Sequence, residues 1–79
     1  MTRVPYGVTA RKFIAALKKD GFTLKRTRGS HRLYVHSDGR RVIVSYHHSG
    51  DTFPIGTLQG MIADTGWTEE DLRRLKLLK

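Results

Sequence analysis

The chain of 79 residues carries 15 Lys and Arg against 7 Asp and Glu, a formal net charge of +8 at pH 7. This length suits one small domain over residues 1–79, and the absence of cysteine excludes disulfides and thiolate metal sites. With no apolar run long enough to cross a bilayer and no signal-peptide pattern, we expect a soluble cytoplasmic protein.

The positive charge is concentrated in the first half of the chain. From Lys12 to Arg41 the only acidic residues are Asp20 and Asp38, both at expected turns. So strong a field on a small surface predicts a polyanionic or acidic partner, and this distribution favours nucleic acid over a charge that serves solubility alone.

The first expected element is a helix over about residues 10–20. Thr9 is its predicted N-cap, Phe13, Ile14 and Leu17 recur at helical spacing, and Gly21 supplies a left-handed stop.

Three strands are expected next, over residues 22–28, 31–37 and 40–46. Gly29-Ser30 and Asp38-Gly39 are predicted to be two-residue loops, the second being a strong hairpin signal. This register pairs His31 with Tyr46 and Arg26 with Leu33. The remaining predicted pairs are Leu24 with Val35, Val35 with Val42, and Leu33 with Val44.

Alternation of side chains then predicts the two faces of the sheet. The core face is predicted to carry Phe22, Leu24, Leu33, Val35, Val42 and Val44. Arg26, Arg28, His31 and Tyr46 are expected to form a basic rim at the uncovered end of that same face. The opposite, solvated face is predicted to hold Thr23, Lys25, Arg32, Tyr34, His36 and Arg41.

Two more helices complete the expected fold. Pro54 can open a helix with Ile55, Leu58, Met61 and Ile62 inward and Gly66 as its stop, and Trp67 is expected in the core. A capping box from Thr68 to Asp71 begins a short terminal helix. The result is an α+β, two-layer α-β-β-β-α domain with a short C-terminal helix, the order of the double-stranded-RNA-binding fold.

His31 is the main catalytic candidate. A histidine can act as general base or acid at the 2′-hydroxyl or the leaving oxygen of RNA, because its unperturbed pKa lies near neutrality. Arg26 and Arg28 would favour its neutral form and hold a phosphate. The alternative is a histidine that only begins a strand.

Other polar residues are weaker candidates for RNA or phosphate binding. Ser30 belongs to the turn beside His31, Lys12 lies on the basic first helix, and His48 could bind phosphate or transfer a second proton. For His47 an exposed loop position is the preferred interpretation. No cysteine or helical histidine pair supports zinc, so we expect neither a metal nor another cofactor.

Five short motifs, read together, resemble the HicA (YcfA-like) toxin family. They are Gly21-Phe22, Gly29-Ser30-His31, Asp38-Gly39-Arg40, His48-Ser49-Gly50 and Gly56-Thr57-Leu58. The resemblance spans Thr9 to Leu72, with departures at Tyr46 and Ile55, near which members often have proline.

This resemblance implies an mRNA interferase, a small endoribonuclease toxin of a type II toxin–antitoxin system. It implies mRNA as substrate, a HicB antitoxin as the neutralising partner, a double-stranded-RNA-binding-like fold, and catalysis at His31. The leading hypothesis is therefore a metal-independent endoribonuclease. The alternatives are a non-catalytic RNA-binding module of the same fold and a domain that docks an acidic protein.

Overall fold

The computed structural model describes residues 4–78. The elements in chain order are α1 (Ala10–Lys19), β1 (Thr23–Arg28), β2 (His31–Val35), β3 (Arg41–Ser45), α2 (Ile55–Thr65) and α3 (Glu69–Arg74). The strands form an antiparallel sheet in the order β1-β2-β3. The predicted α+β arrangement is confirmed and is compatible with the double-stranded-RNA-binding fold. Within the described range, no helix is long and apolar enough to cross a membrane.

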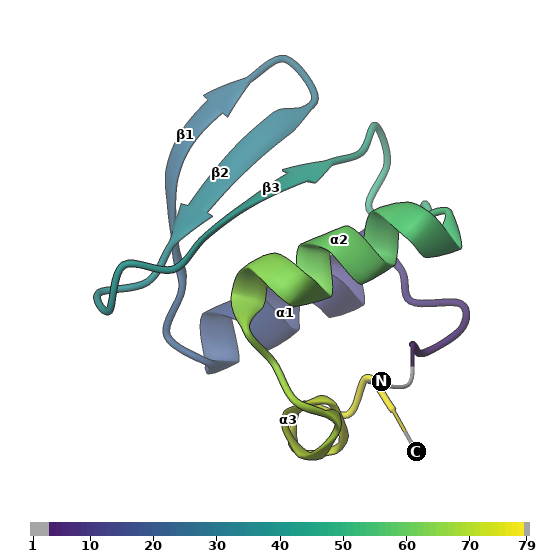
Figure 1. Ribbon diagram of the computed structural model, residues 1–79. Coiled ribbons are helices and arrows are strands. Elements are labelled where there is room, and N and C mark those ends of the chain that lie inside the picture. The colour runs from purple at the N-terminus through teal and green to yellow at the C-terminus, as the bar shows by residue number, and fades with distance from the viewer. Residues whose placement is uncertain (1–3, 79) are drawn as a thin grey trace.

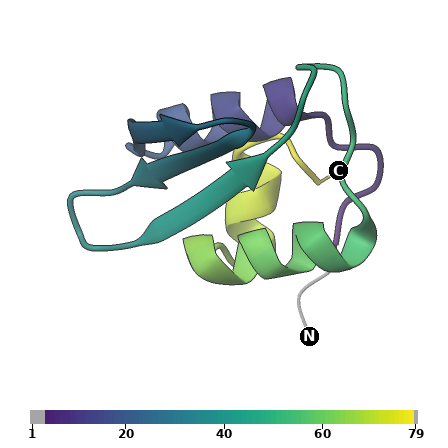
Figure 2. The ribbon, with the colours of Figure 1, turned by 90° about the horizontal axis from the view of Figure 1, so that it is seen from above.

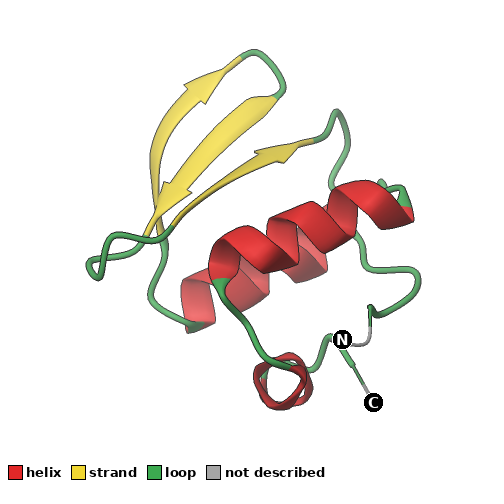
Figure 3. Cartoon of the chain, in the orientation of Figure 1, coloured by secondary structure: helices red, strands yellow, loops and turns green. Residues whose placement is uncertain are grey.

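Both long helices lie on one side of the sheet. Figure 1 shows α1 and α2 beneath the strands, and Figure 2 shows α3 between the two helices when the molecule is seen from above. The other side of the sheet carries no helix, as the secondary-structure colouring makes plain (Figure 3). We call this side of the sheet the open face.

The helix ends follow the capping signals in the sequence. The Thr9 hydroxyl accepts a hydrogen bond from the Lys12 amide at 3.2 Å. Gly66 ends α2 in the left-handed conformation with φ 72°, and Thr68 and Asp71 form a complete capping box at α3. These local devices explain why the helix boundaries could be predicted closely.

The core lies between the sheet and the three helices. Its most completely buried large side chains include Phe13, Leu17, Phe22, Val42, Val44 and Leu72. Trp67 is 4% exposed and packs at 5.5 Å from the Phe13 ring, which confirms its predicted core position. Ile55 is instead 51% exposed, because the first turn of α2 extends past the end of β3 (Figure 1).

The predicted register of the β2–β3 hairpin is wrong by one residue. His31 pairs with Ser45, Leu33 with Ile43 and Val35 with Arg41. The reason is the loop, which has three residues, 37–39, rather than two. The His36 amide donates to the Arg40 carbonyl at 2.9 Å, and Gly39 takes the left-handed conformation with φ 100°. This is the three-residue hairpin loop that ends in a left-handed glycine.

The register change reverses the faces of β2. Tyr34 and His36, predicted to be solvated, turn toward the helices: Tyr34 is 3% exposed, and the His36 ring packs against Phe22 at 5.2 Å. Leu33 and Val35, predicted to face the core, turn to the open face, where Leu33 is nevertheless buried, at 8% exposed. On β3 the prediction holds, because Val42 and Val44 are buried.

A β-bulge on β1 cancels this reversal at the start of that strand, so that Leu24 shares the helix side with Tyr34. The pairs Arg26–Leu33 and Arg28–His31 follow the predicted two-residue turn, but Leu24 pairs with Tyr34 instead of Val35 because the register shifts between Leu24 and Arg26. Leu24 is 49% exposed and is not the core residue that alternation predicted.

Candidate functional site

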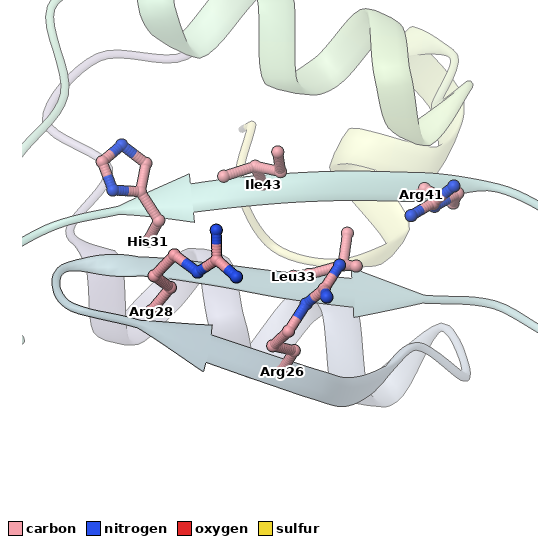
Figure 4. A pocket seen from close by; sticks show the side chains of 6 residues that line it. All are labelled: Arg26, Arg28, His31, Leu33, Arg41 and Ile43. Atoms are coloured by element: carbon pink, nitrogen blue, oxygen red, sulfur yellow. The ribbon is translucent and has the colours of Figure 1, made fainter.

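A basic depression lies on the open face of the sheet. Its lining residues are Arg26, Arg28, His31, Leu33, Arg41 and Ile43 (Figure 4). They come from all three strands and include no acidic residue. We call this feature the open-face depression.

Strand pairing arranges these side chains in rows across the sheet. Residues that face one another on neighbouring strands lie side by side on the same face. The first row is Arg28, His31 and Ser45; the second is Arg26, Leu33 and Ile43; the third contains Val35 and Arg41. Successive rows are about 7 Å apart, given a rise of about 3.4 Å per residue. Figure 4 shows His31 and Arg28 at one end, the two apolar residues in the middle and Arg41 at the other end.

The arginines of the depression differ from the others in residues 4–78. Arg40 and Arg74 form ion pairs with Asp20, and Arg73 pairs with Glu69. Arg11 donates to the Ser49 hydroxyl, and Arg32 donates to two backbone carbonyls. The guanidinium groups of Arg26, Arg28 and Arg41 have no hydrogen-bond or ion-pair partner within the described range. Three uncompensated charges therefore converge on one depression.

The turn before His31 is held in place from the neighbouring strand. Gly29 takes φ 60°, which a two-residue hairpin loop requires. The Ser30 carbonyl accepts hydrogen bonds from the Tyr46 amide at 3.2 Å and from the Arg32 guanidinium at 2.9 Å. The backbone that presents the exposed His31 side chain is thus fastened to β3.

The predicted rim is correct in three residues but wrong in its face and in Tyr46. Arg26, Arg28 and His31 do lie together, yet on the open face rather than on the core-facing side. Tyr46 lies on the helix side, where its ring is stacked by the Arg32 guanidinium at 3.8 Å. The one-residue register change is the cause, since it pairs His31 with Ser45.

The remaining predicted site residues lie around the depression or away from it. Ser30 is in the adjoining turn, with its hydroxyl 3.4 Å from that of Ser45. His48 is exposed in the loop that follows β3 and does not line the depression. Lys12 lies on α1 and lines separate depressions with the chain ends. The assignment of His48 and Lys12 to RNA stays a prediction.

The loop after β3 is organised by Asp51. Its carboxylate accepts hydrogen bonds from the His47 and His48 amides, at 3.3 and 3.0 Å. The hydrogen bond from the His48 amide is the main cause that lowers the pKa of Asp51 below its ordinary value, and the hydrogen bond from the His47 amide adds to it. Across residues 4–78, no three His, Cys, Asp or Glu side chains group as metal ligands would.

Arg41, Ile43 and Leu33 are the lining residues that sequence reasoning did not assign to the site. Arg41 was expected on the solvated face, and Leu33 in the core. The available signal was Ser37-Asp38-Gly39, which suits a three-residue loop as well as Asp38-Gly39 suits a two-residue one.

Comparison with protein-family models matches residues 10–67 to the model described as the HicA toxin of bacterial toxin–antitoxin systems. The match covers most of the chain, from the first residue of α1 to Trp67, and so includes every residue of the open-face depression. A search among curated proteins found no match.

Proposed function

The chain belongs to the HicA toxin family of bacterial toxin–antitoxin systems, and from this premise we propose that it is an endoribonuclease that cleaves mRNA through His31 without a metal ion. Membership in a toxin–antitoxin family implies an antitoxin partner. We propose that this partner is a HicB-like protein that neutralises the toxin by covering the open-face depression. The whole chain is proposed to act as one domain.

The observation that carries the proposal is a set of three arginines, unpaired within residues 4–78, beside an exposed histidine. Arg28 lies directly across from His31, and Arg26 and Arg41 line the same depression. Guanidinium groups that lack an acidic partner in the protein are available to phosphate oxygens, which they can bind with two parallel hydrogen bonds. A polyanion is the ligand that such a surface fits.

The proposed reaction uses the RNA's own 2′-hydroxyl as nucleophile. His31 accepts the 2′-hydroxyl proton as O2′ forms a bond to phosphorus, and the bond from phosphorus to O5′ breaks. The departing O5′ takes up a proton from water or from the protonated His31. The products are a 2′,3′-cyclic phosphate and a 5′-hydroxyl end. Arg28, with Arg26 nearby, stabilises the negative charge that builds up on the phosphate oxygens, the role that a metal ion has in other nucleases.

One observation favours a second candidate, an RNA-binding module without catalysis. Within residues 4–78 the His31 ring has no hydrogen-bond partner, so no second group fixes its orientation or tautomer. The same arginines would bind RNA in either case. The two candidates differ only in what His31 does.

Cleavage of mRNA by purified protein in excess chelator tests the proposal. We expect wild type to cleave and His31→Ala to be slower by about 100-fold or more, in line with the loss of a general base, while RNA affinity changes little. His47→Ala, a matched exposed histidine, should keep wild-type activity. Equal cleavage by wild type and His31→Ala would refute the role of His31. RNA binding without cleavage by either would establish the non-catalytic module.

A further inference from the structure

The centre of the open-face depression is apolar although its ends are cationic. Leu33 and Ile43 face each other across β2 and β3, with Arg26 beside Leu33 in the same row. Ile43 is 56% exposed and Leu33 is 8% exposed, so Ile43 supplies most of the accessible apolar surface and Leu33 lies beside it at the floor of the depression. The other large, strongly exposed apolar residues in the described range are Tyr6, Leu24 and Ile55, and none of these lines the depression.

We propose that Leu33 and Ile43 seat one unpaired nucleobase, so that the site takes single-stranded RNA rather than a duplex. This inference rests on the proposed binding of RNA and deepens it. The phosphates on either side of the seated nucleotide would lie toward Arg28 and His31 at one end and toward Arg41 at the other, as the arrangement in Figure 4 allows.

Charge and geometry select this occupant. The three unpaired guanidinium groups attract phosphate. Phosphate and ribose are polar and are not stabilised by contact with an aliphatic surface, whereas the apolar face of a base is stabilised when it is removed from water there. In a duplex the base faces are hidden in the stack, and proteins recognise it mainly through its shape, its phosphates and its 2′-hydroxyls. Only an unstacked base can lie on the second row while its backbone reaches the cations of the first and third rows.

The same geometry predicts weak base selectivity at this position. Leu33 and Ile43 offer no hydrogen-bond donor or acceptor from their side chains, so they cannot distinguish one base edge from another. Contact with a base face is tolerant of sequence and grows with the area of the ring system. Purines should therefore bind somewhat more tightly than pyrimidines here.

The test measures the affinity of a short 2′-fluoro oligoribonucleotide, which lacks the attacking hydroxyl and is not cleaved. This affinity is compared with that of the same strand carrying abasic sites along its centre, and with that of a duplex of the same sequence. Ile43→Thr keeps the branched β-carbon that a strand favours and removes apolar surface. Ile55→Thr makes the same change at a residue that is 51% exposed outside the depression.

We expect Ile43→Thr to weaken binding of the single strand about five- to tenfold, at the low end of the range for a base contact. The abasic strand should bind wild type and Ile43→Thr equally. The dependence on salt should not change, because no phosphate contact is lost. Ile55→Thr should bind like wild type, and wild type should prefer the single strand to the duplex.

Three results of the RNA-binding measurements would overturn this inference. They are unchanged affinity of Ile43→Thr for the single strand, equal weakening on the abasic strand, and tighter binding of the duplex than of the single strand. Loss of antitoxin binding alone would assign the apolar residues to the protein partner, and so would also overturn it. If Ile43→Thr shows the expected loss of affinity for the single strand while no form of the protein cleaves RNA, binding of a base at Leu33 and Ile43 is supported and the proposed catalysis is refuted.

Discussion

At the scale of single residues, pairing distinguishes the arginines that hold the fold together from those available to a ligand. Arg40 donates to Asp20, Asp38 and the Thr65 carbonyl, so its charge is used within the protein. Arg41, the next residue along, points to the open face and is unpaired in the described chain. Arg40, just before β3, and Arg41, its first residue, have opposite surroundings because successive side chains alternate across the sheet.

Salt dependence of RNA binding checks this distinction. Arg41→Gln should reduce the slope of log affinity against log salt concentration by about 0.7, the value for one phosphate contact to a single strand. Arg73→Gln removes an exposed guanidinium that is paired with Glu69 at 2.9 Å, and should leave the slope unchanged. Equal slopes for Arg41→Gln and wild type would mean that Arg41 does not contact phosphate.

Part of this site could be predicted from the residues alone. Arg26, Arg28 and His31 are brought together by the Gly29-Ser30 turn, whose two-residue length the sequence indicates clearly. Arg41 lies on the solvent-facing side that alternation predicted, but it joins the other two arginines only because the register of the next hairpin turns the facing residues of β2 to that side. That register depends on a loop length that the sequence leaves ambiguous. One residue of difference moves a side chain to the other face.

At the scale of elements, the β2–β3 hairpin decides which face of β2 is buried. Binary patterning could not settle the choice, because Leu33 and Val35 are as apolar as a core strand requires and Tyr34 fits either side. Hydrogen bonds within the three-residue loop determine the register and therefore which face of β2 is buried. Asp38 accepts from the Arg40 amide at 3.1 Å, and the Gly39 amide donates to the His36 carbonyl at 3.0 Å.

Two glycine substitutions should change stability in opposite directions. Gly39→Ala should lower the free energy of unfolding by about 1 kcal/mol, because alanine is strained at φ 100° even though its Cβ would meet no other atom. Gly60→Ala, in an exposed turn of α2 that is also open to a Cβ, should raise it by up to about 1 kcal/mol. Chemical denaturation measures both. A stabilising Gly39→Ala would contradict the left-handed loop.

At the scale of the whole molecule, Asp20 ties the elements together at the end of α1. Its carboxylate accepts hydrogen bonds from the Trp67 indole at 2.8 Å, from Arg40 at 3.2 Å and from Arg74 at 3.1 Å. These donors come from the β2–β3 hairpin, the α2–α3 connection and α3. Burial alone would raise the pKa of Asp20, but the hydrogen bonds from Trp67 and Arg74 and the charges of Arg40 and Arg74 outweigh it and lower that pKa.

Asp20→Asn should therefore lower the free energy of unfolding by roughly 1–3 kcal/mol near neutral pH, because it weakens several hydrogen bonds at once. A pKa lower in the folded state stabilises the protein above the unfolded value of about 3.9, and this contribution is lost as pH falls through the folded pKa. The difference between wild type and Asp20→Asn should accordingly shrink below about pH 4.

Asp64→Asn, a substitution on the exposed surface of α2, is the control and should change little at any pH. Backbone hydrogen bonds also lower the pKa of Asp38, Asp51 and Asp71, so both proteins will lose stability in acid, and only their difference reports on Asp20. A difference that stays constant down to pH 3 would contradict the role given to the Asp20 carboxylate.

The end groups of the cleaved RNA distinguish attack by the 2′-hydroxyl from attack by water. If His31 acts as proton acceptor for the RNA's own 2′-hydroxyl, mRNA fragments made in excess chelator will carry 2′,3′-cyclic phosphates and 5′-hydroxyls. A 2′-deoxy nucleotide on the 5′ side of the cleaved bond will block cleavage there. Fragments with 5′-phosphates, or cleavage that survives the 2′-deoxy substitution, would show that water attacks the phosphate instead and would contradict this account of the open-face depression.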